Sequence, residues 1–434
     1  LCDRQNLCED TMKLFQRLLV APAALGLMAP LAANADVTAI SKDSDLNSEV
    51  IQARVDGVEA QLGEVMAGQF SSSTKMSGKA AFITGYVDDD NDSTQADSMT
   101  FEYMYQLNLN TSFTGEDNLY TRIKTGNVSD ASGTTGHFTN KTQGTYLSAA
   151  NSNDNVLKVD KLWYQFPVGD SLTAWVGPKI ENYYMLASAP SIYKPVTKQF
   201  ALGGNGSAYG SSTSPGFGVA WTQQVDDPSD GRWAVSANYT SKDGGLSTEN
   251  EGLFGDNASN FLLTKIEYGS PRWQVSLATS FKDNIATGKY DGYFHTAAAE
   301  AATGNMTAYG LRAYWKPETT GAIPAVQLGY DMADIDNAST NGVDETEGWM
   351  VGLGWDDVFI DGNKAGLAFG SRQHATSYNG TGSDVAKDNS VWEAYYTFKV
   401  NDGVSITPAV FGGSEVEAAN KDITGGVLLT EFRF

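Results

Sequence analysis

Positively charged side chains recur at alternate positions in several segments of this sequence, separated by small or apolar residues. Arg122 and Lys124 are two residues apart, and Arg312 and Arg372 lie in segments of the same kind. Residues two apart lie on one face of an extended strand, so these cations would form a charged surface opposite an apolar one. Such a surface attracts anions and donates hydrogen bonds to polar solutes. The same parity gives that face seven further cations and only four acids: Arg232, Lys265, Arg272, Lys282, Lys364, Lys399 and Arg433 against Glu102, Glu267, Glu393 and Glu431.

A second group combines aromatic rings with cations in the long irregular segment 181–214. Tyr183 and Tyr184 lie near its start, Lys194 and Lys198 lie in its middle, and Glu181 is its only acid. Aromatic faces beside cations can pack on sugar rings or guide anions. The alternative is that the segment only caps one end of the fold or forms a contact between subunits.

Residues suited to catalysis or to metal binding are scarce. His137, His295 and His374 are far apart and lack metal-ligand spacing, and no nucleophile elbow, zinc-protease motif or phosphate-binding loop occurs. The acidic run 88–92 lacks the glycine and distal glutamate of a calcium loop, so it is either a solvated surface or a weak site for divalent cations. The sequence therefore predicts neither an enzyme nor a cofactor nor a metal site. Other acids are expected, like the histidines, in external loops: Asp226, Asp227, Asp334, Asp336, Asp344 and Glu345.

Composition excludes several classes of protein. The 434 residues include 29 Lys and Arg against 52 Asp and Glu, a net charge of -23. Nucleic-acid binding needs clustered cations, so this balance argues against it. The 45 glycines and 11% aromatic residues are typical of a β protein. Beyond residue 35 no run of about 18 apolar residues could form a membrane-spanning helix, although the strands of a membrane barrel would escape that criterion.

From Ser77 onward, apolar residues recur at every second position, as in Phe101, Tyr103 and Tyr105. Connections alternate strictly between long ones, such as 127–155, and short ones, such as 401–403, which is typical of outer-membrane barrels. The sequence therefore predicts an all-β fold, a 16-stranded antiparallel transmembrane β-barrel, with a soluble sandwich or β-helix as the alternative. The sixteen segments are 77–87, 100–113, 118–126, 156–167, 171–180, 215–224, 231–241, 259–268, 272–282, 306–316, 324–331, 347–355, 363–372, 390–399, 404–412 and 425–434.

The last strand carries a further pattern. Leu428, Thr430, Phe432 and Phe434 share one face, and the chain ends on Phe434. A terminal aromatic residue on an amphipathic strand is the pattern that the outer-membrane assembly machinery reads. We therefore expect that machinery, together with outer-membrane lipid and lipopolysaccharide, among the partners of this chain.

The first 76 residues precede the barrel and divide into three parts. Residues 1–11 hold both cysteines and are interpreted as an upstream extension. Residues 12–35 combine basic residues, an apolar run and a small-x-small site, which predicts a cleaved signal peptide and export. Residues 36–76 are interpreted as a periplasmic linker with a helical stalk, and 77–434 as the barrel domain. The chain from Asp36 onward has no cysteine, which excludes thiol chemistry and disulfides there.

The stalk is predicted from a heptad pattern. Ile51, Val55, Val58, Leu62 and Val65 recur at spacings of 4, 3, 4 and 3. That seam could join two or three copies of the chain, and a homotrimer is the expectation. The alternative is one amphipathic helix packed on its own domain.

Several of these segments resemble the cyanobacterial outer-membrane porins that are labelled iron-uptake porins or OprB-type carbohydrate-selective porins. The resemblance is carried by Met12–Gln16, by Val55–Ala60, by Gln69–Lys79 and by the Phe-terminated last strand. Family members usually carry a surface-layer-homology domain before the stalk, and this chain has only residues 36–45 at that place. The resemblance implies an outer-membrane channel for carbohydrates, ions or iron species.

The residues and the resemblance together predict a passive porin for small hydrophilic solutes. In general porins, which this architecture resembles, the loop after the fifth strand folds inward and narrows the pore. The expected constriction consists of Arg122, Lys124, Arg312, Arg372, Lys194, Lys198, Tyr183 and Tyr184, and replacing Arg122 and Arg312 by Glu should favour cations. A substrate-specific sugar or iron channel and a tether between outer membrane and cell wall are the alternatives.

Overall fold

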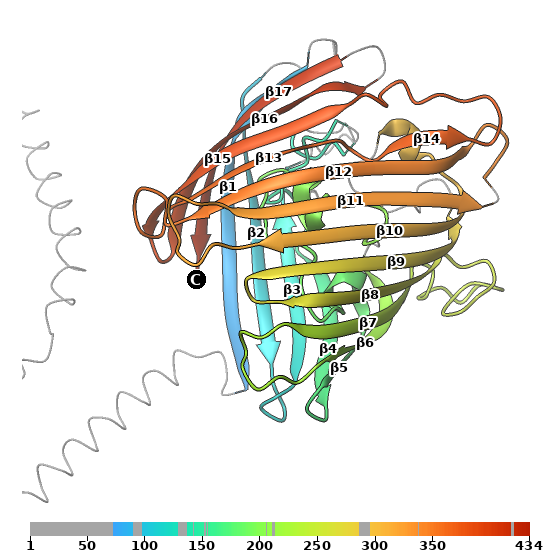
Figure 1. The fold of residues 1–434 in the computed structure, drawn as a ribbon, viewed down its shortest axis with the longest axis horizontal. Helices are drawn as coiled ribbons and strands as arrows, with labels where there is room; N and C mark the ends of the chain where they lie inside the picture. Colours follow the sequence, from blue (N-terminus) through green and yellow to red (C-terminus); the bar gives the residue numbers. More distant parts are fainter. Residues whose placement is uncertain are drawn as a thin grey trace, which may run out of the picture. The chain divides into compact units, whose positions relative to one another are not determined.

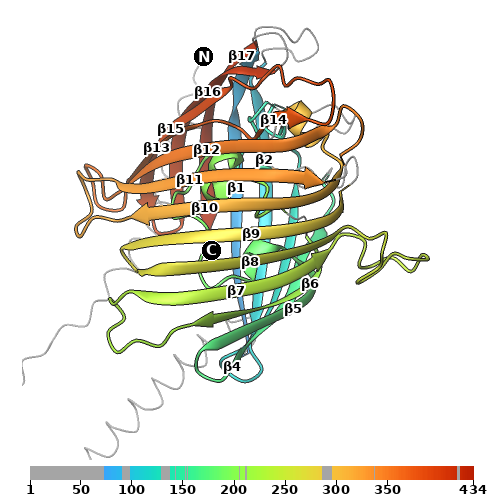
Figure 2. The same cartoon turned by 45° about the vertical axis from the view of Figure 1, so that its right-hand side comes forward.

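The alternating residues of this chain form one antiparallel β-sheet that closes into a barrel (Figures 1 and 2). The computed structural model describes residues 73–89, 98–128, 137–141, 143–151, 153, 155–204, 206–210, 213–285, 296–336, 338–417 and 421–434. Neighbours along the chain pair with each other, and β1 also pairs with β17, which closes the sheet. The strands are β1 (Thr74–Asp89), β2 (Thr100–Thr111), β3 (Asn118–Gly126), β4 (Lys158–Val168), β5 (Leu172–Ile180), β6 (Ser214–Thr222), β7 (Arg232–Ser241), β8 (Asn260–Ser270), β9 (Trp273–Ile285), β10 (Gly304–Trp315), β11 (Ala325–Asp336), β12 (Val343–Asp356), β13 (Lys364–Gly370), β14 (His374–Tyr378), β15 (Ser390–Asn401), β16 (Val404–Glu417) and β17 (Lys421–Arg433).

The seventeen strand segments make sixteen barrel strands, because β13 and β14 are two parts of one strand. Both pair with β12, with Gly370 opposite Met350 and His374 opposite Glu347. All sixteen predicted segments are confirmed as strands, with ends that differ by a few residues. The helices among the described residues are the short η1 (Asn182–Tyr184), η2 (Lys198–Gly203) and α3 (Ala297–Glu300). In this part of the chain, no helix is long and apolar enough to cross a membrane.

Apolar side chains point outward from the barrel and polar ones point inward. On β8, Leu262 and Ile266 are 43% and 46% exposed on the outer face, whereas Lys265 and Glu267 are buried inside. A continuous apolar outer surface suits contact with lipid, where charged side chains cost about 2–4 kcal/mol near the midplane. The predicted assignment of faces is therefore confirmed on this strand.

The first and last strands meet at the rim that carries the short turns. The Gly78 amide donates a hydrogen bond to the Phe434 carbonyl oxygen at 2.6 Å. The Phe434 side chain is exposed, and the Phe432 ring centroid lies 5.1 Å from that of Phe82. β1 begins at Thr74 rather than at Ser77, so the last predicted linker residues belong to the strand. The predicted extension, the signal peptide, the five heptad residues and the rest of the linker lie outside the described residues.

Strict alternation of long and short connections is wrong in detail. On the long-loop side, connections 337–342 and 418–420 are shorter than 223–231 and 316–324 on the opposite side. The reason is that strand pairing continues beyond the apolar belt there, with ladder hydrogen bonds satisfying the backbone. Several residues expected in external loops therefore lie elsewhere: Asp334 and Asp336 are in β11, Asp344 and Glu345 in β12 and His374 in β14, and Asp226 and Asp227 are in the short-turn connection 223–231.

Candidate functional site

The segment after β5 turns into the barrel instead of covering its mouth. Figures 1 and 2 both show this green segment, with η1 and η2, inside the ring of strands. We call its described residues, 181–204, 206–210 and 213, the inward loop. The Ala187 amide donates to Ser236 Oγ on β7 at 2.9 Å, and the Ile192 amide donates to Gln327 Oε1 on β11 at 3.0 Å. These contacts with two separate strands of the wall give the loop the inward course that the sequence predicted.

One carboxylate on β15 holds the middle of the inward loop. Glu393, which is fully buried, accepts hydrogen bonds at Oε1 from Tyr193 Oη (2.9 Å) and from the Val196 amide (3.1 Å). Its Oε2 accepts from the Thr197 amide (2.8 Å) and from Thr197 Oγ1 (2.5 Å). Four donors from residues 193–197 converge on one side chain, so Glu393 fixes the position of the loop across the barrel.

Cations on β8 to β10 contact the inward loop on both sides of this middle part. Arg312 Nη2 forms an ion pair with Asp331 at 2.8 Å, and its Nε donates to the Leu202 carbonyl oxygen at 2.7 Å. Lys282 Nζ donates to the Gly210 carbonyl oxygen at 2.7 Å, and Lys265 donates to Ser188 Oγ at 2.9 Å. These three cations contact the loop rather than open water.

Arg312 and Arg372 do not line an open passage, which corrects that part of the predicted constriction. Their exposed fractions are 2% and 1%. Arg312 lies under the inward loop, and Arg372 donates a hydrogen bond to the Val416 carbonyl oxygen on β16. Alternation predicted that both side chains point inward, but the inward loop covers Arg312, and Arg372 lies in the break between β13 and β14 and reaches β16.

Glycines allow the inward loop to approach the barrel wall closely. A Cβ atom on Gly329 would lie 1.7 Å from the Gly203 carbonyl oxygen, and one on Gly206 would lie 1.9 Å from Asp331 Cγ. Both distances are shorter than any real contact of a Cβ atom, so these positions require glycine for this packing. The glycines at 203–206 therefore have a packing role.

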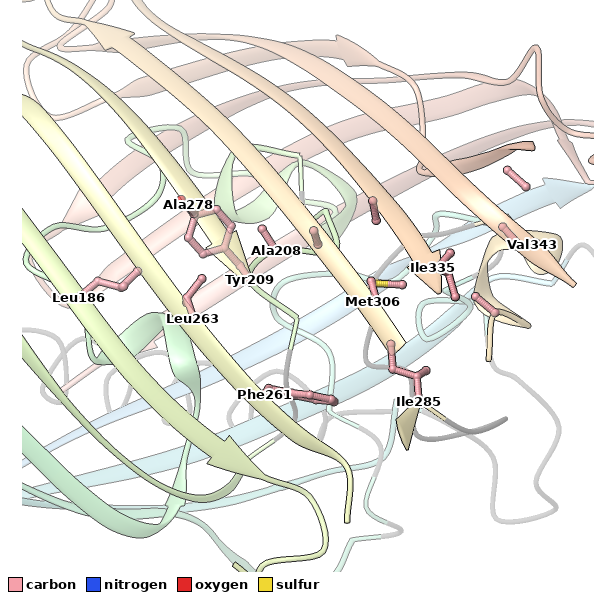
Figure 3. Close-up of a cluster of buried hydrophobic side chains, with 14 residues drawn as sticks. Leu186, Ala208, Tyr209, Phe261, Leu263, Ala278, Ile285, Met306, Ile335 and Val343 are labelled. Atoms are coloured by element: carbon pink, nitrogen blue, oxygen red, sulfur yellow. The ribbon is translucent and has the colours of Figure 1, made fainter. Parts of the chain in front are cut away.

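Much of the barrel interior on the β8 to β12 side is filled by apolar side chains. Tyr209 of the inward loop packs in one cluster with Leu263, Met306 and Ile335 of the wall, as Figure 3 shows. A second cluster, including Phe138, Leu147 and Ile83, packs connection 127–157 against β1 and its neighbours. Polar solutes are excluded from both regions. Other inward positions of β1 to β3 carry polar side chains and, with β4, form a hydrophilic surface: Lys79, Gln106, Asn108, Arg122 and Lys124.

Arg122 is the centre of that hydrophilic surface. Its Nε donates to Tyr120 Oη at 2.9 Å and to Asn108 Oδ1 at 3.3 Å, and its Nη1 lies 3.5 Å from Tyr184 Oη of the inward loop. Its side chain is 19% exposed, and Asp160 Oδ2 lies 3.7 Å away. These contacts hold the guanidinium between the wall and the loop with part of it open to solvent.

A register shift brings Asp160 into this group. Arg122 pairs with Lys161 and Ile123 pairs with Val159, so Asp160 has no opposite residue on β3. Such a bulge redirects a side chain. Asp160 then lies 3.9 Å from Lys161 Nζ, and Lys161 is paired with Glu181 of the inward loop. Alternation alone could not have assigned Asp160 or Lys161 to this surface.

The ammonium groups of Lys124 and Lys198 are both influenced by neighbouring cations and by the Asp160 carboxylate. Lys124 is repelled by Lys198, Arg122 and Lys79 and attracted by Asp160. Lys198 Nζ lies 4.0 Å from the centroid of the Tyr146 ring. Burial lowers the pKa of Lys198 to about 8, with Lys141 and Lys161 lowering it further and Glu181 opposing them. Electrostatic repulsion thus couples cations of β1, β3, β4 and the loop.

The remaining predicted site residues take different positions. Tyr184 faces Arg122, whereas Tyr183 packs against the apolar cluster of Figure 3. The Lys194 side chain is exposed, and its carbonyl oxygen accepts from Tyr395 Oη at 2.7 Å. Leu428 and Phe434 are exposed on the outer face of the last strand, which also carries Thr430 and Phe432.

Sequence reasoning missed four of the residues described above: Lys79, Asp160, Lys161 and Asp331. Lys79 is paired with Glu431 at 2.7 Å, and Asp331 is paired with Arg312. Lys79 occupies an inward position in the alternating pattern of the first strand, so the sequence could have assigned it to the polar face. Asp331 was not singled out because it was the last residue of its predicted strand. The inward position of Lys161 results from the bulge in β4, which alternation does not predict.

Comparisons with known proteins agree with the barrel fold. A family model described as "Carbohydrate-selective porin, OprB family" matches residues 31–412. An uncharacterized protein of Nostoc sp. is 25% identical over 396 residues, which cover 83% of this chain and 65% of the relative. An uncharacterized protein of Synechocystis sp. is 26% identical over 468 residues, covering 99% of this chain and 80% of the relative. The chain thus spans less than two thirds of the Nostoc relative.

Two solved structures share the fold. OprB of Pseudomonas putida has a TM-score of 0.56 at 11% identity and covers 83% of this chain and 94% of its own. OmpF of Salmonella typhi in complex with daunomycin has a TM-score of 0.50 at 11% identity, covering 83% of this chain and 97% of its own. At this identity the likeness concerns the barrel fold alone.

Proposed function

Because the chain belongs to the OprB family of carbohydrate-selective porins, we propose that it is an outer-membrane channel for passive diffusion of small hydrophilic solutes, sugars among them. The observation that carries the proposal is the hydrophilic surface of β1 to β4, which faces the inward loop inside the barrel. Arg122, Lys124 and Lys198 would interact with solutes there, beside Tyr184. A narrow passage lined by charge selects solutes by size and sign.

The first test is reconstitution of the whole protein in a planar bilayer. We expect stepwise conductance in potassium chloride, and a reversal potential across a salt gradient that corresponds to anion preference, because cations line the hydrophilic surface. Swelling of liposomes in small sugars should accompany it. A purified, folded protein that gives neither conductance nor swelling would contradict a channel function.

The channel should lose part of its anion preference at alkaline pH. Burial lowers the pKa of Lys198 to about 8, so the ammonium is charged below that pH and becomes neutral above it. Raising the pH from 7 to about 9.5 should therefore shift the reversal potential toward cation permeation. The nearby Glu181, Asp160, Lys141 and Lys161 act on the same titration, and Tyr146 covers the ammonium. In Lys198→Arg the shift should be smaller, because a guanidinium keeps its proton; an equal shift would contradict this assignment.

A homotrimer joined by the heptad segment, contact with lipopolysaccharide and recognition of the last strand by the assembly machinery stay predictions. Neither the family match nor any described residue supports iron uptake: in this part of the chain, no group of three or more His, Cys, Asp or Glu could hold a metal ion.

A further inference from the structure

Around Lys124 on the hydrophilic surface, positively charged side chains outnumber the carboxylates that act on it. The Lys124 ammonium is repelled by Lys198, Arg122 and Lys79, and Asp160 is the carboxylate that attracts it. Among the described residues, no carboxylate lies within ion-pair distance of Lys124 Nζ. Like charges brought together in this way repel one another, and the repulsion falls when an anion binds between them.

The neighbouring acids are already engaged elsewhere. Glu431 lies 2.7 Å from Lys79, and Glu181 is paired with Lys161. Asp160 is shared between Arg122 and Lys161 at 3.7 and 3.9 Å, longer than a direct charged hydrogen bond. The described residues therefore hold these cations in place without supplying a close counter-charge for Lys124.

Groups suited to the neutral part of a solute lie beside the cations. The Tyr120 ring is half-buried, and it packs against the buried Trp163 ring of β4, with the two centroids 4.9 Å apart. Tyr120 Oη and Asn108 lie within hydrogen-bond distance of Arg122. Aromatic faces and amide groups of this kind contact sugar rings, while a guanidinium and an ammonium bind an oxyanion.

We propose that Arg122, Lys124 and Lys198 form a binding site for an oxyanion, either free phosphate or the phosphate group of a small sugar. The channel would then favour anionic over neutral solutes of the same size. This inference rests on the proposed channel function and adds a substrate class to it.

The test measures block of single-channel chloride current in potassium chloride at neutral pH. Inorganic phosphate, glucose 6-phosphate and neutral glucose are added in turn at equal concentration. We expect the two phosphate compounds to reduce the current at millimolar concentration and glucose to leave it nearly unchanged. Stronger block by glucose 6-phosphate than by phosphate would identify the sugar-borne group as the ligand, and block by phosphate alone would identify the free oxyanion; both support the site.

Substitutions connect the block to the named residues. In Lys124→Gln the half-blocking concentration should rise about tenfold, the factor that loss of one charge-assisted hydrogen bond gives. Lys124→Arg should keep the block, because it keeps the charge. Arg272→Gln is the matched control, since Arg272 lies in the turn between β8 and β9, paired with Glu318.

Two results would overturn the site while leaving the channel intact. One is equal block by glucose and glucose 6-phosphate, and the other is an unchanged half-blocking concentration in Lys124→Gln. Absence of any conductance in the wild-type protein would instead contradict the proposed function itself, so the two failures are distinguishable.

Discussion

Replacing Glu393 by alanine should raise the single-channel conductance severalfold and make the current noisy. The buried carboxylate accepts four hydrogen bonds from residues 193–197 of the inward loop. Their loss would weaken the position of the loop by about 3–5 kcal/mol, because hydrogen bonds to a charged group contribute about 1.5–3 kcal/mol each and are not additive. The barrel should stay closed, since β15 pairs with β13 and β16 through its backbone.

Graded variants make the Glu393 experiment specific. Glu393→Gln keeps one acceptor oxygen for Tyr193 and Val196 but loses the acceptor for Thr197, so its conductance should be intermediate. Glu116→Ala, in the exposed turn between β2 and β3, removes an acid without touching the loop. Heat-modified migration on gels checks that each barrel is folded. Equal conductance and noise in wild type and Glu393→Ala would mean that the other loop contacts suffice.

The strands were predictable from the sequence because a membrane barrel imposes one rule on every strand. Each must alternate between lipid and interior, so the period of two is local and repeats sixteen times. β3 was predicted with the bounds that the structure has, at 118–126. The predicted strand ends were wrong where alternation between lipid and interior no longer applies. β11 and β12 extend beyond the apolar belt and carry the acids Asp336 and Asp344. Ladder hydrogen bonds, not side-chain patterning, maintain those ends.

The site was predictable only in part, because alternation says which way a side chain points and not what covers it. Arg122 and Arg312 both point inward, yet one is partly open and the other lies under the Leu202 carbonyl of the inward loop. That contact joins residues 110 apart in sequence. The same holds for Glu393, whose partners are about 200 residues away. Only the folded chain reveals which lumen charges fix the loop and which face solutes.

Reversing two charges on β3 should turn an anion-preferring channel into a cation-preferring one. Arg122→Glu together with Lys124→Glu changes the energy of a monovalent ion about 4 Å away by about 2 kcal/mol per substitution in a water-like dielectric. That corresponds to a change of at least about tenfold in the permeability ratio. The measurement is the reversal potential across a potassium chloride gradient, with Arg272→Glu at the short-turn rim as the matched control.

Arg312 should not be used for this reversal, although the sequence pattern suggested it. Arg312→Glu would place a carboxylate beside the buried Asp331, which has 2% side-chain exposure, and leave the Leu202 carbonyl without its donor. Breaking a buried pair of this kind costs about 3–5 kcal/mol, so we expect a less stable barrel and a displaced loop. Its conductance should therefore change more than its selectivity, the opposite of the β3 double variant. If Arg312→Glu reversed the selectivity and the β3 double variant did not, the proposed location of the passage at β1 to β4 would be wrong. The passage would then lie on the β10 side of the barrel.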